Sequence, residues 1–97
     1  MSALFQSEFA FQVKGDSMSP LIRPGDEVRV NGDLIPRHGN IVLVHLDGRV
    51  MIRQLFRSGS LTSLLPGNSD YEAIAIDAGS PCEIQGVVTH VTHALDL

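Results

Sequence analysis

The part of this sequence best suited to chemistry is a serine placed in a turn. Residues 15–20 (GDSMSP) interrupt two strand-like patterns, and residues 24–26 (PGD) follow closely. A serine in such a turn, here Ser17, can expose its hydroxyl and nearby backbone N–H groups, as an acyl-transfer nucleophile and its oxyanion require. A polar turn that only connects two strands has the same residue types. The segment alone therefore leaves the catalytic and the structural interpretation open.

The elements around this turn have the periodicity of strands. Apolar residues alternate at 9–13 and 27–31, and residues 41–46 form a nearly continuous apolar run, as in a strand covered on both faces. Asp47 and Gly48, between two such runs, predict a tight hairpin. No window has the 3.6-residue period of a capped helix, so helix should be nearly absent. The strands that we predict are residues 9–14, 27–31, 41–46, 50–56, 61–65, 72–76 and 83–91.

Composition limits the classes of function. The chain has 97 residues, 43% of them hydrophobic and 19% charged, which predicts a single folded domain over residues 1–97. The strand periodicity makes this domain all-β. Its formal net charge of −4, with seven Lys plus Arg, argues against direct nucleic-acid binding. No apolar run approaches about eighteen residues, so we expect no membrane span. The single cysteine, Cys82, excludes an internal disulfide and a Cys-based zinc cage, and we expect a cytoplasmic protein without a cofactor.

Four segments carry a family resemblance that covers nearly the whole chain. They are residues 11–26, residues 38–42 (HGNIV) with 46–48 (LDG), residues 64–69 (LLPGNS) and residues 86–91 (GVVTHV). In this order they resemble the LexA/UmuD-type serine peptidase family, which includes LexA-like and phage repressors and the SOS mutagenesis protein UmuD. The central hairpin is closest to UmuD. The resemblance implies a strongly bent, partly barrel-like all-β sheet of the type found in the LexA C-terminal domain and in signal peptidases.

The same resemblance assigns roles to the residues of the turn. In this family a neutral lysine on the second hairpin strand takes the proton of the serine hydroxyl. Ser17 then stands at the nucleophile position, with Asp16 and Met18 beside it at the oxyanion site and specificity pocket, and Arg53 occupies the lysine position. Lowering a lysine pKa from about 10.4 to near 7 costs about 4.6 kcal/mol, whereas an arginine would need about 7.5–9 kcal/mol. Arginine is effectively never deprotonated in proteins, so we predict a silent or severely impaired peptidase site.

Other groups are poor substitutes for the missing base. Lys14 is the only lysine, and three residues before the serine in a strand it should face the opposite way. His45 is interpreted as an ordinary strand histidine, and His38 lies in a predicted turn. His90 and His93 are three residues apart in a strand-like segment and should not face the same way. No Cys or carboxylate cluster joins them, so we predict no metal site.

Two classes of function remain. The first, favoured by the UmuD-like hairpin, is a homodimeric accessory to error-prone translesion DNA synthesis in the SOS response, with the RecA filament and a Y-family DNA polymerase as partners. The second is the C-terminal dimerisation and self-cleavage domain of a LexA-like or phage repressor, attached to an N-terminal DNA-binding domain that regulates transcription. A competent self-cleaving peptidase is disfavoured by Arg53, and a signal peptidase by the lack of a membrane anchor. Residues 1–16 contain no Ala-Gly or Cys-Gly bond of the kind the family cleaves, and Ala78-Gly79 is interpreted as a coincidence.

The resemblance also implies a dimer that forms through the sheet near the last strand. Ile84, Val88 and His90 are the interface positions, and Val87 and Val91 add apolar area, although both faces of the segment are apolar. We further hypothesise that the groove between the serine and the arginine binds an extended peptide by strand addition.

The remaining features have structural interpretations. Gly86 predicts a close backbone approach or a bulge, and Cys82 a small, partly buried side chain. The aspartates in predicted turns are interpreted as local turn caps rather than metal ligands; they are Asp16, Asp26, Asp33 and Asp47.

Overall fold

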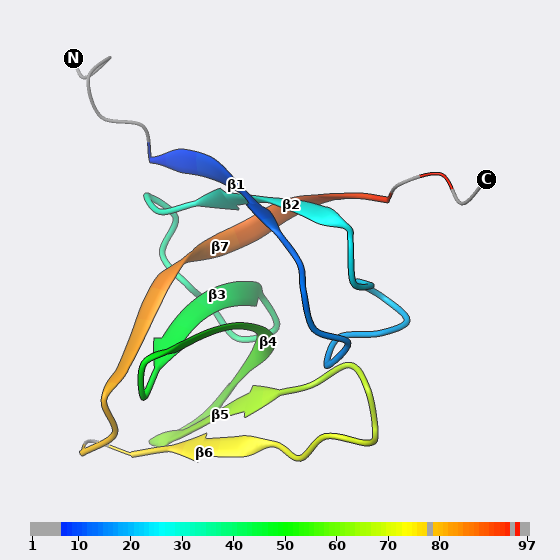
Figure 1. The fold of residues 1–97 in the computed structure, drawn as a ribbon. Coiled ribbons are helices and arrows are strands. Elements are labelled where there is room, and N and C mark those ends of the chain that lie inside the picture. The colour runs from blue at the N-terminus through cyan, green and yellow to red at the C-terminus, as the bar shows by residue number, and fades with distance from the viewer. Residues whose placement is uncertain (1–6, 78, 94, 96–97) are drawn as a thin grey trace.

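Seven β-strands make up the fold, and the described residues (7–77, 79–93 and 95) contain no helix. In this computed structural model the strands are β1 (Glu8–Gln12), β2 (Glu27–Asn31), β3 (Ile41–Leu46), β4 (Arg49–Ser58), β5 (Leu61–Leu65), β6 (Ile74–Ile76) and β7 (Cys82–Thr92). Neighbouring strands all pair antiparallel, in one sheet with the order β1-β2-β7-β3-β4-β5-β6 (Figure 1). The predicted all-β fold class is confirmed.

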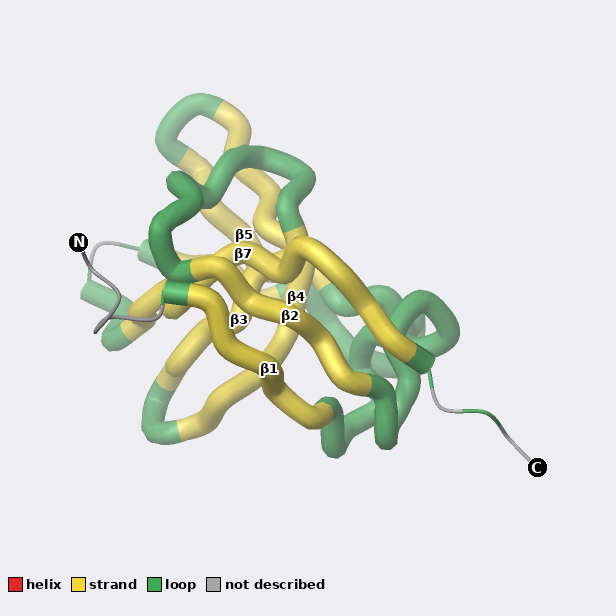
Figure 2. The backbone as a smooth tube through the Cα atoms, turned by 90° about the horizontal axis from the view of Figure 1, so that it is seen from above, coloured by secondary structure: helices red, strands yellow, loops and turns green. Residues whose placement is uncertain are grey.

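The long strand β7 is where the sheet bends. Its first half pairs with β3 and its second half with β2, and the register shifts within both ladders. Such bulges increase the local twist of a strand. Gly86 lies beside one of them, and a Cβ at this position would come within 2.5 Å of Val30 Cγ1 and 3.0 Å of the Asn31 carbonyl oxygen. The glycine therefore provides the predicted close approach, and the sheet coils (Figure 2). Strands β1 and β6 remain the open edges of the sheet (Figure 1).

Strand bounds agree with the predictions for β2, β3 and β5 and differ elsewhere. Strands β4 and β7 are longer than predicted by one or two residues at each end, and β6 begins at Ile74 instead of residue 72. Strand β1 ends at Gln12, so Lys14 lies outside it. Val13 nevertheless stays paired, because its N–H donates to the Asp26 carbonyl and its own carbonyl accepts from the Gly25 N–H, both at 2.8 Å. The chain thus leaves the sheet earlier than the alternating pattern indicates.

The predicted hairpin between β3 and β4 is present at Asp47 and Gly48. Both residues have positive φ angles, 52° and 80°, as the turn types that match the twist of paired strands require. Leu46 stands opposite Arg49, and the register places Val42 opposite Arg53. The turn therefore fixes the position of Arg53 along the sheet.

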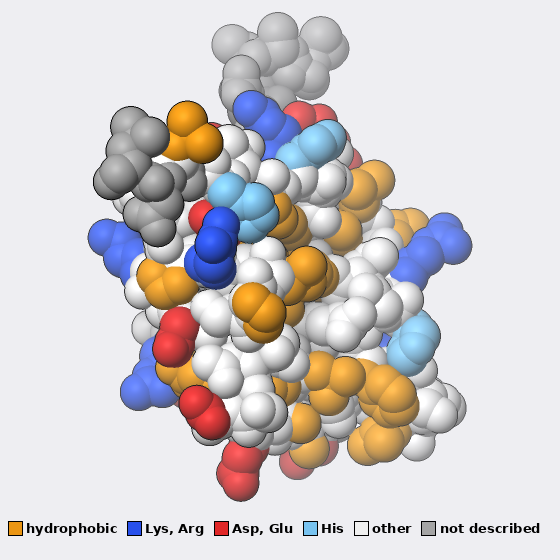
Figure 3. Space-filling view, turned by 90° about the vertical axis from the view of Figure 1, so that its right-hand side faces the viewer, with side chains coloured by type: hydrophobic (Ala, Val, Ile, Leu, Met, Phe, Trp, Pro, Cys, Tyr) orange, Lys and Arg blue, Asp and Glu red, His pale blue; other side chains and the backbone are white. Residues whose placement is uncertain are grey.

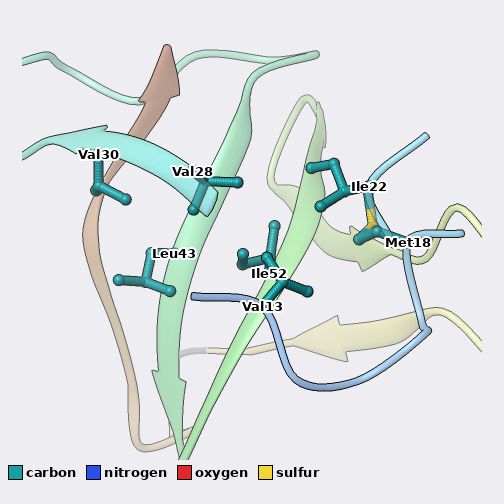
Figure 4. Packing of buried hydrophobic residues seen from close by; sticks show 7 residues of the cluster. All are labelled: Val13, Met18, Ile22, Val28, Val30, Leu43 and Ile52. Atoms are coloured by element: carbon teal, nitrogen blue, oxygen red, sulfur yellow. The ribbon is translucent and has the colours of Figure 1, made fainter. Parts of the chain in front are cut away.

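Hydrophobic side chains cover both faces of β3, as its apolar run predicts. The cluster on one face, drawn in Figure 4, consists of Val13, Met18, Ile22, Val28, Val30, Leu43 and Ile52. The cluster on the other face consists of Val42, Val44, Leu46, Leu55, Leu64 and Val87. Met18 and Ile22 come from the loop that contains Ser17, and their side chains are 3% and 0% exposed. The core therefore holds this loop against the sheet.

The molecular surface on the loop side has a mixed character. Figure 3 shows the side on which the right-hand loops of Figure 1 lie, with acidic and basic side chains interspersed and hydrophobic ones in small separate groups. Within the part of the chain that the structure describes, no helix has the length and apolarity needed to cross a bilayer.

Candidate functional site

The backbone around Ser17 is fixed by hydrogen bonds to a distant loop. The N–H groups of Gly67 and Asn68 both donate to the Ser17 carbonyl at 2.9 Å, and the Asn68 side-chain amide donates to the Asp16 carbonyl at 3.1 Å. A Cβ on Gly67 would lie only 2.8 Å from the Met18 carbonyl oxygen, so this close approach depends on glycine. The position of Ser17 is therefore set by main-chain contacts and by the burial of Met18.

The Ser17 hydroxyl meets the side chain of Arg53 on β4. Arg53 Nη1 donates to Ser17 Oγ at 2.5 Å and to the Ile52 carbonyl at 2.9 Å. The arginine is only 8% exposed, and its Nε is buried without a hydrogen-bond partner. Burial lowers the Arg53 pKa, and the nearby Tyr71 opposes that shift. The structure thus brings together the two side chains that the resemblance places at the nucleophile and base positions.

Tyr71 closes one side of this arrangement. The Arg53 guanidinium carbon lies 5.8 Å from the centre of the Tyr71 ring, within the range of a cation–π contact. The Tyr71 hydroxyl donates to Asp16 Oδ1 at 2.5 Å, and this bond to a carboxylate, followed by the charge of Asp16, raises the Tyr71 pKa. Tyr71 therefore links the turn before the serine to the arginine. Nothing in the sequence pointed to Tyr71, because a tyrosine 55 positions after Asp16 leaves no local pattern.

These residues line a cleft of about 470 Å³. Its wall combines apolar and cationic side chains from β1, the Ser17 loop and the first half of β4. Two neighbouring backbone N–H groups, those of Ser17 and Met18, donate no hydrogen bond within the described chain. They are donors that an oxyanion would need. The residues lining the cleft are Phe11, Val13, Lys14, Gly15, Ser17, Met18, Arg49, Val50, Met51, Ile52, Arg53 and Tyr71.

The direction of the Ser17–Arg53 hydrogen bond limits the chemistry. A guanidinium has five N–H donors and no acceptor, so it contributes a proton to the bond and accepts none from the hydroxyl. Burial lowers the Arg53 pKa, but the ordinary pKa of an arginine lies far above that of a lysine, so the guanidinium keeps its proton. The arrangement can orient and polarise the hydroxyl, but Arg53 itself offers no proton acceptor for general-base activation of Ser17.

The two flanking residues differ in where their side chains lie. Met18 both lines the cleft and belongs to the core, so packing and pocket lining are combined in one side chain. The Asp16 side chain is outside the cleft lining and accepts from Tyr71. The Asp16 side chain does not cap its own turn. The turn is closed instead by the Asp16 backbone carbonyl, which accepts from the Ser19 N–H at 3.1 Å. Their roles at an oxyanion site or specificity pocket stay predictions.

The expectation that Lys14 faces away from the serine was wrong. Lys14 is exposed and lines the same cleft, because β1 ends at Gln12 and strand alternation no longer applies. No hydrogen bond joins Lys14 to Ser17 among the contacts of residues 7–77. Lys14 therefore adds a cationic side chain to the cleft.

The histidines have other partners. His38 Nδ1 accepts from the Arg57 N–H at 3.0 Å, and its ring lies edge-on against Phe56. His45 is half-buried in β3, between strands β4 and β7. His90 contacts only the neighbouring Thr89 hydroxyl, at 2.9 Å, among the described polar groups. No group of three or more metal-ligating side chains occurs in the described segments.

The fourth histidine forms a contact that the sequence did not reveal. His93 Nδ1 lies 2.6 Å from Asp26 Oδ2, and the same oxygen accepts from the Arg23 N–H at 2.8 Å. The bond from the Arg23 backbone is the main cause that lowers the Asp26 pKa, with His93 acting in the same direction. Asp26 caps its turn as predicted, and it also ties the end of β7 to the loop after Ser17.

The residues predicted at a dimer interface lie along β7 and differ in burial. Ile84 and Val88 are half-buried against the two core clusters, while His90 is exposed. Val87 is 6% exposed and belongs to the core, so it is unavailable as interface area. Cys82 is a half-buried free thiol. The Ala78-Gly79 bond includes a residue, Ala78, that lies outside the described residues.

The chain thus combines a bent antiparallel sheet with a serine turn that contacts β4. Residues 3–89 match the family described as Peptidase S24-like. The chain belongs to this family, and the resemblance predicted from the sequence is confirmed.

Similar proteins carry the name LexA repressor. The chain is 36% identical over 81 residues to that of Acidovorax sp. (strain JS42), covering 82% of the chain and 36% of the relative. It is 37% identical over 84 residues to the LexA repressor of Magnetococcus marinus, covering 86% of the chain and 36% of the relative. For Verminephrobacter eiseniae the identity is 35% over 89 residues, covering 89% and 40%. The chain thus spans well under half the length of these relatives.

Proposed function

We propose that this chain is the regulatory domain of a LexA-like repressor in which the peptidase chemistry is silent. The support comes from the LexA repressors that match most of the chain and from the contact between Ser17 and Arg53. These matches favour the repressor alternative over the UmuD-like polymerase accessory that the sequence analysis put first. In this proposal the domain acts in the cytoplasm as a homodimer and holds N-terminal DNA-binding domains together.

The observation that carries the silent site is the 2.5 Å bond from Arg53 Nη1 to Ser17 Oγ. In a serine–lysine pair the hydroxyl donates to a neutral amine, which activates the oxygen as a nucleophile. Here the hydroxyl oxygen is the acceptor, and a permanent cation occupies the position of the base. Self-cleavage as a means of inactivating the repressor is therefore absent in this proposal.

A reporter assay tests the repressor role. The chain is fused to a helix-turn-helix domain that represses only when dimerised, and repression is measured beside the unfused DNA-binding domain. We expect strong repression from the fusion, together with an intact fusion protein on blots after DNA damage. The substitution His90→Asp, at an exposed position of the predicted interface, should weaken repression, while Leu61→Asp, an exposed residue on β5, is the matched control. A soluble fusion that fails to repress would contradict the proposal.

A further inference from the structure

Arg53 is a buried cation without a carboxylate. Among the described residues, Arg29 pairs with Glu8 and His93 Nδ1 lies beside Asp26 Oδ2, and neither contact includes Arg53. Its Nη1 is occupied by Ser17 Oγ and the Ile52 carbonyl, its Nε is buried and unpartnered, and Nη2 has no protein acceptor among residues 7–77. Buried charges in proteins are normally paired, so this guanidinium lacks an anion.

The cleft in front of Arg53 has the electrostatics of an anion site. Lys14 and Arg49 line it together with Arg53, and the described lining includes no Asp or Glu. The chain as a whole carries a formal net charge of −4, so this concentration of positive charge is local. A concave surface lined by one sign of charge attracts the opposite sign.

The serine adds a second donor to this site. Because Arg53 Nη1 donates to Ser17 Oγ, the hydroxyl proton of Ser17 is free to point elsewhere. The hydroxyl and the guanidinium of Arg53 can therefore both donate to an acceptor in the cleft. A carboxylate, with two oxygens and four lone-pair directions, fits two donors of this kind.

One edge of β4 is open beside the same residues. Strand β3 pairs with Arg49–Gln54, whereas β5 pairs only with Gln54–Ser58. The Leu55 N–H donates to the Asn40 carbonyl, on the β3 side of the sheet. Alternation along an antiparallel strand then turns the backbone groups of Val50 and Ile52 toward the unpaired edge, where the Ile52 carbonyl already accepts from Arg53 Nη1. An extended peptide can add to such an edge through its main chain.

We propose that the cleft binds an extended peptide segment through an Asp or Glu side chain whose carboxylate pairs with Arg53 and accepts from Ser17. The main chain of the segment lies along Val50 and Ile52, and its apolar neighbours contact Phe11 and Met18. This inference rests on the part of the proposed function that makes the site non-hydrolytic. The replacement of a base by Arg53 then changes a cleaving site into a carboxylate-recognition site.

Fluorescence anisotropy with three labelled hexapeptides of alanine and valine tests this proposal. The first peptide has a central Glu and an amidated C-terminus. The second has a central Gln and the same amidated C-terminus, and the third has a central Gln and a free C-terminal carboxylate. We expect the Glu peptide to bind at least about tenfold more tightly than either Gln peptide, as a charge-assisted bond gives. Equal binding of the Glu and amidated Gln peptides, or a preference for the free C-terminus alone, would overturn the proposal.

Variants of the protein locate the binding site. Arg53→Met should reduce the affinity for the Glu peptide to that for the Gln peptide, while Arg37→Gln, an exposed arginine between β2 and β3, should change neither. If Arg53→Met does not fold by circular dichroism, the double variant Lys14→Gln and Arg49→Gln serves instead. Both residues are exposed, and their loss should weaken binding of the Glu peptide severalfold. Unchanged binding in that variant would also count against the proposal.

The same samples separate this inference from the proposed function. Mass spectrometry of the bound Glu peptide should show it intact after prolonged incubation. A cleaved peptide would refute the silent site, whereas an intact peptide without preference for Glu would refute only the carboxylate recognition.

Discussion

Replacing Arg53 by lysine should restore the reactivity of Ser17. The lysine amine would enter the same buried position beside the hydroxyl, where Arg53 is now 8% exposed and has no carboxylate partner in the described chain. Burial without a compensating anion favours the neutral amine, which accepts a proton. We therefore expect Arg53→Lys to turn the hydroxyl from an acceptor into a donor and so into a nucleophile.

The magnitude follows from the two side chains. A lysine needs its pKa lowered from about 10.4 to near 7, and buried lysines in proteins reach about 5–6, so burial alone can supply the change. Under the same burial the neutral fraction of lysine exceeds that of arginine by about two to three orders of magnitude. Labelling of Ser17 by a fluorophosphonate should become faster by about the same factor. The labelling rate should rise with pH through the lysine pKa and then level off, because only the neutral amine acts as a base.

The assay compares the natural chain with three variants. Arg53→Lys should label rapidly, Arg53→Met should label no faster than the natural chain, and Ser17→Ala should remove the labelling altogether. A Lys14→Gln background identifies any contribution from the other amine in the cleft. Rapid labelling of the natural chain at pH 7 would refute the reasoning, since it would require a base other than the residue at position 53.

Three further predictions concern stability and thiol reactivity. Asp26→Asn should lower the unfolding temperature at pH 7 by several degrees, with Asp33→Asn as the exposed control. The stabilisation from the lowered Asp26 pKa is present above the ordinary value of 3.8 and is lost as the pH falls through the lower value of the folded state. The difference in unfolding temperature between Asp26→Asn and the unmodified chain should therefore shrink in acid. Gly86→Ala should destabilise the fold by about 1–3 kcal/mol in urea unfolding, because the added Cβ would come within 2.5 Å of another side chain. A Cβ at Gly15 would have no atom within 4 Å, so the control Gly15→Ala should leave the stability unchanged. The Cys82 pKa is raised by burial, so Ellman's reagent should react slowly with the folded chain at pH 7.5 and rapidly after unfolding; equal rates would contradict the burial.

Much of the fold was predictable because its signals are local. The apolar run of β3 and the Asp47-Gly48 turn depend on neighbouring residues, and both predictions are confirmed. The contacts that the sequence did not reveal join residues far apart: Tyr71 with Asp16, and His93 with Asp26. Such pairs leave no periodic pattern, so only the three-dimensional structure shows them.

Strand alternation misled the sequence analysis at one position of the site. Lys14 was expected to face away from the serine, yet it lines the cleft because β1 ends before it. The periodic rule holds only inside a paired strand, and the ends of strands are where it fails. For a residue next to a turn, the face on which its side chain lies could therefore be assigned only from the structure.

The scaffold around Ser17 does not depend on the chemistry that Arg53 excludes. The Ser17 carbonyl is held by the Gly67 and Asn68 N–H groups, and Met18 is anchored in the core, so neither contact involves the hydroxyl or its partner. A change of the side chain at position 53 should therefore leave these contacts in place. We therefore expect the side chain at position 53 to decide between cleavage and the proposed peptide recognition.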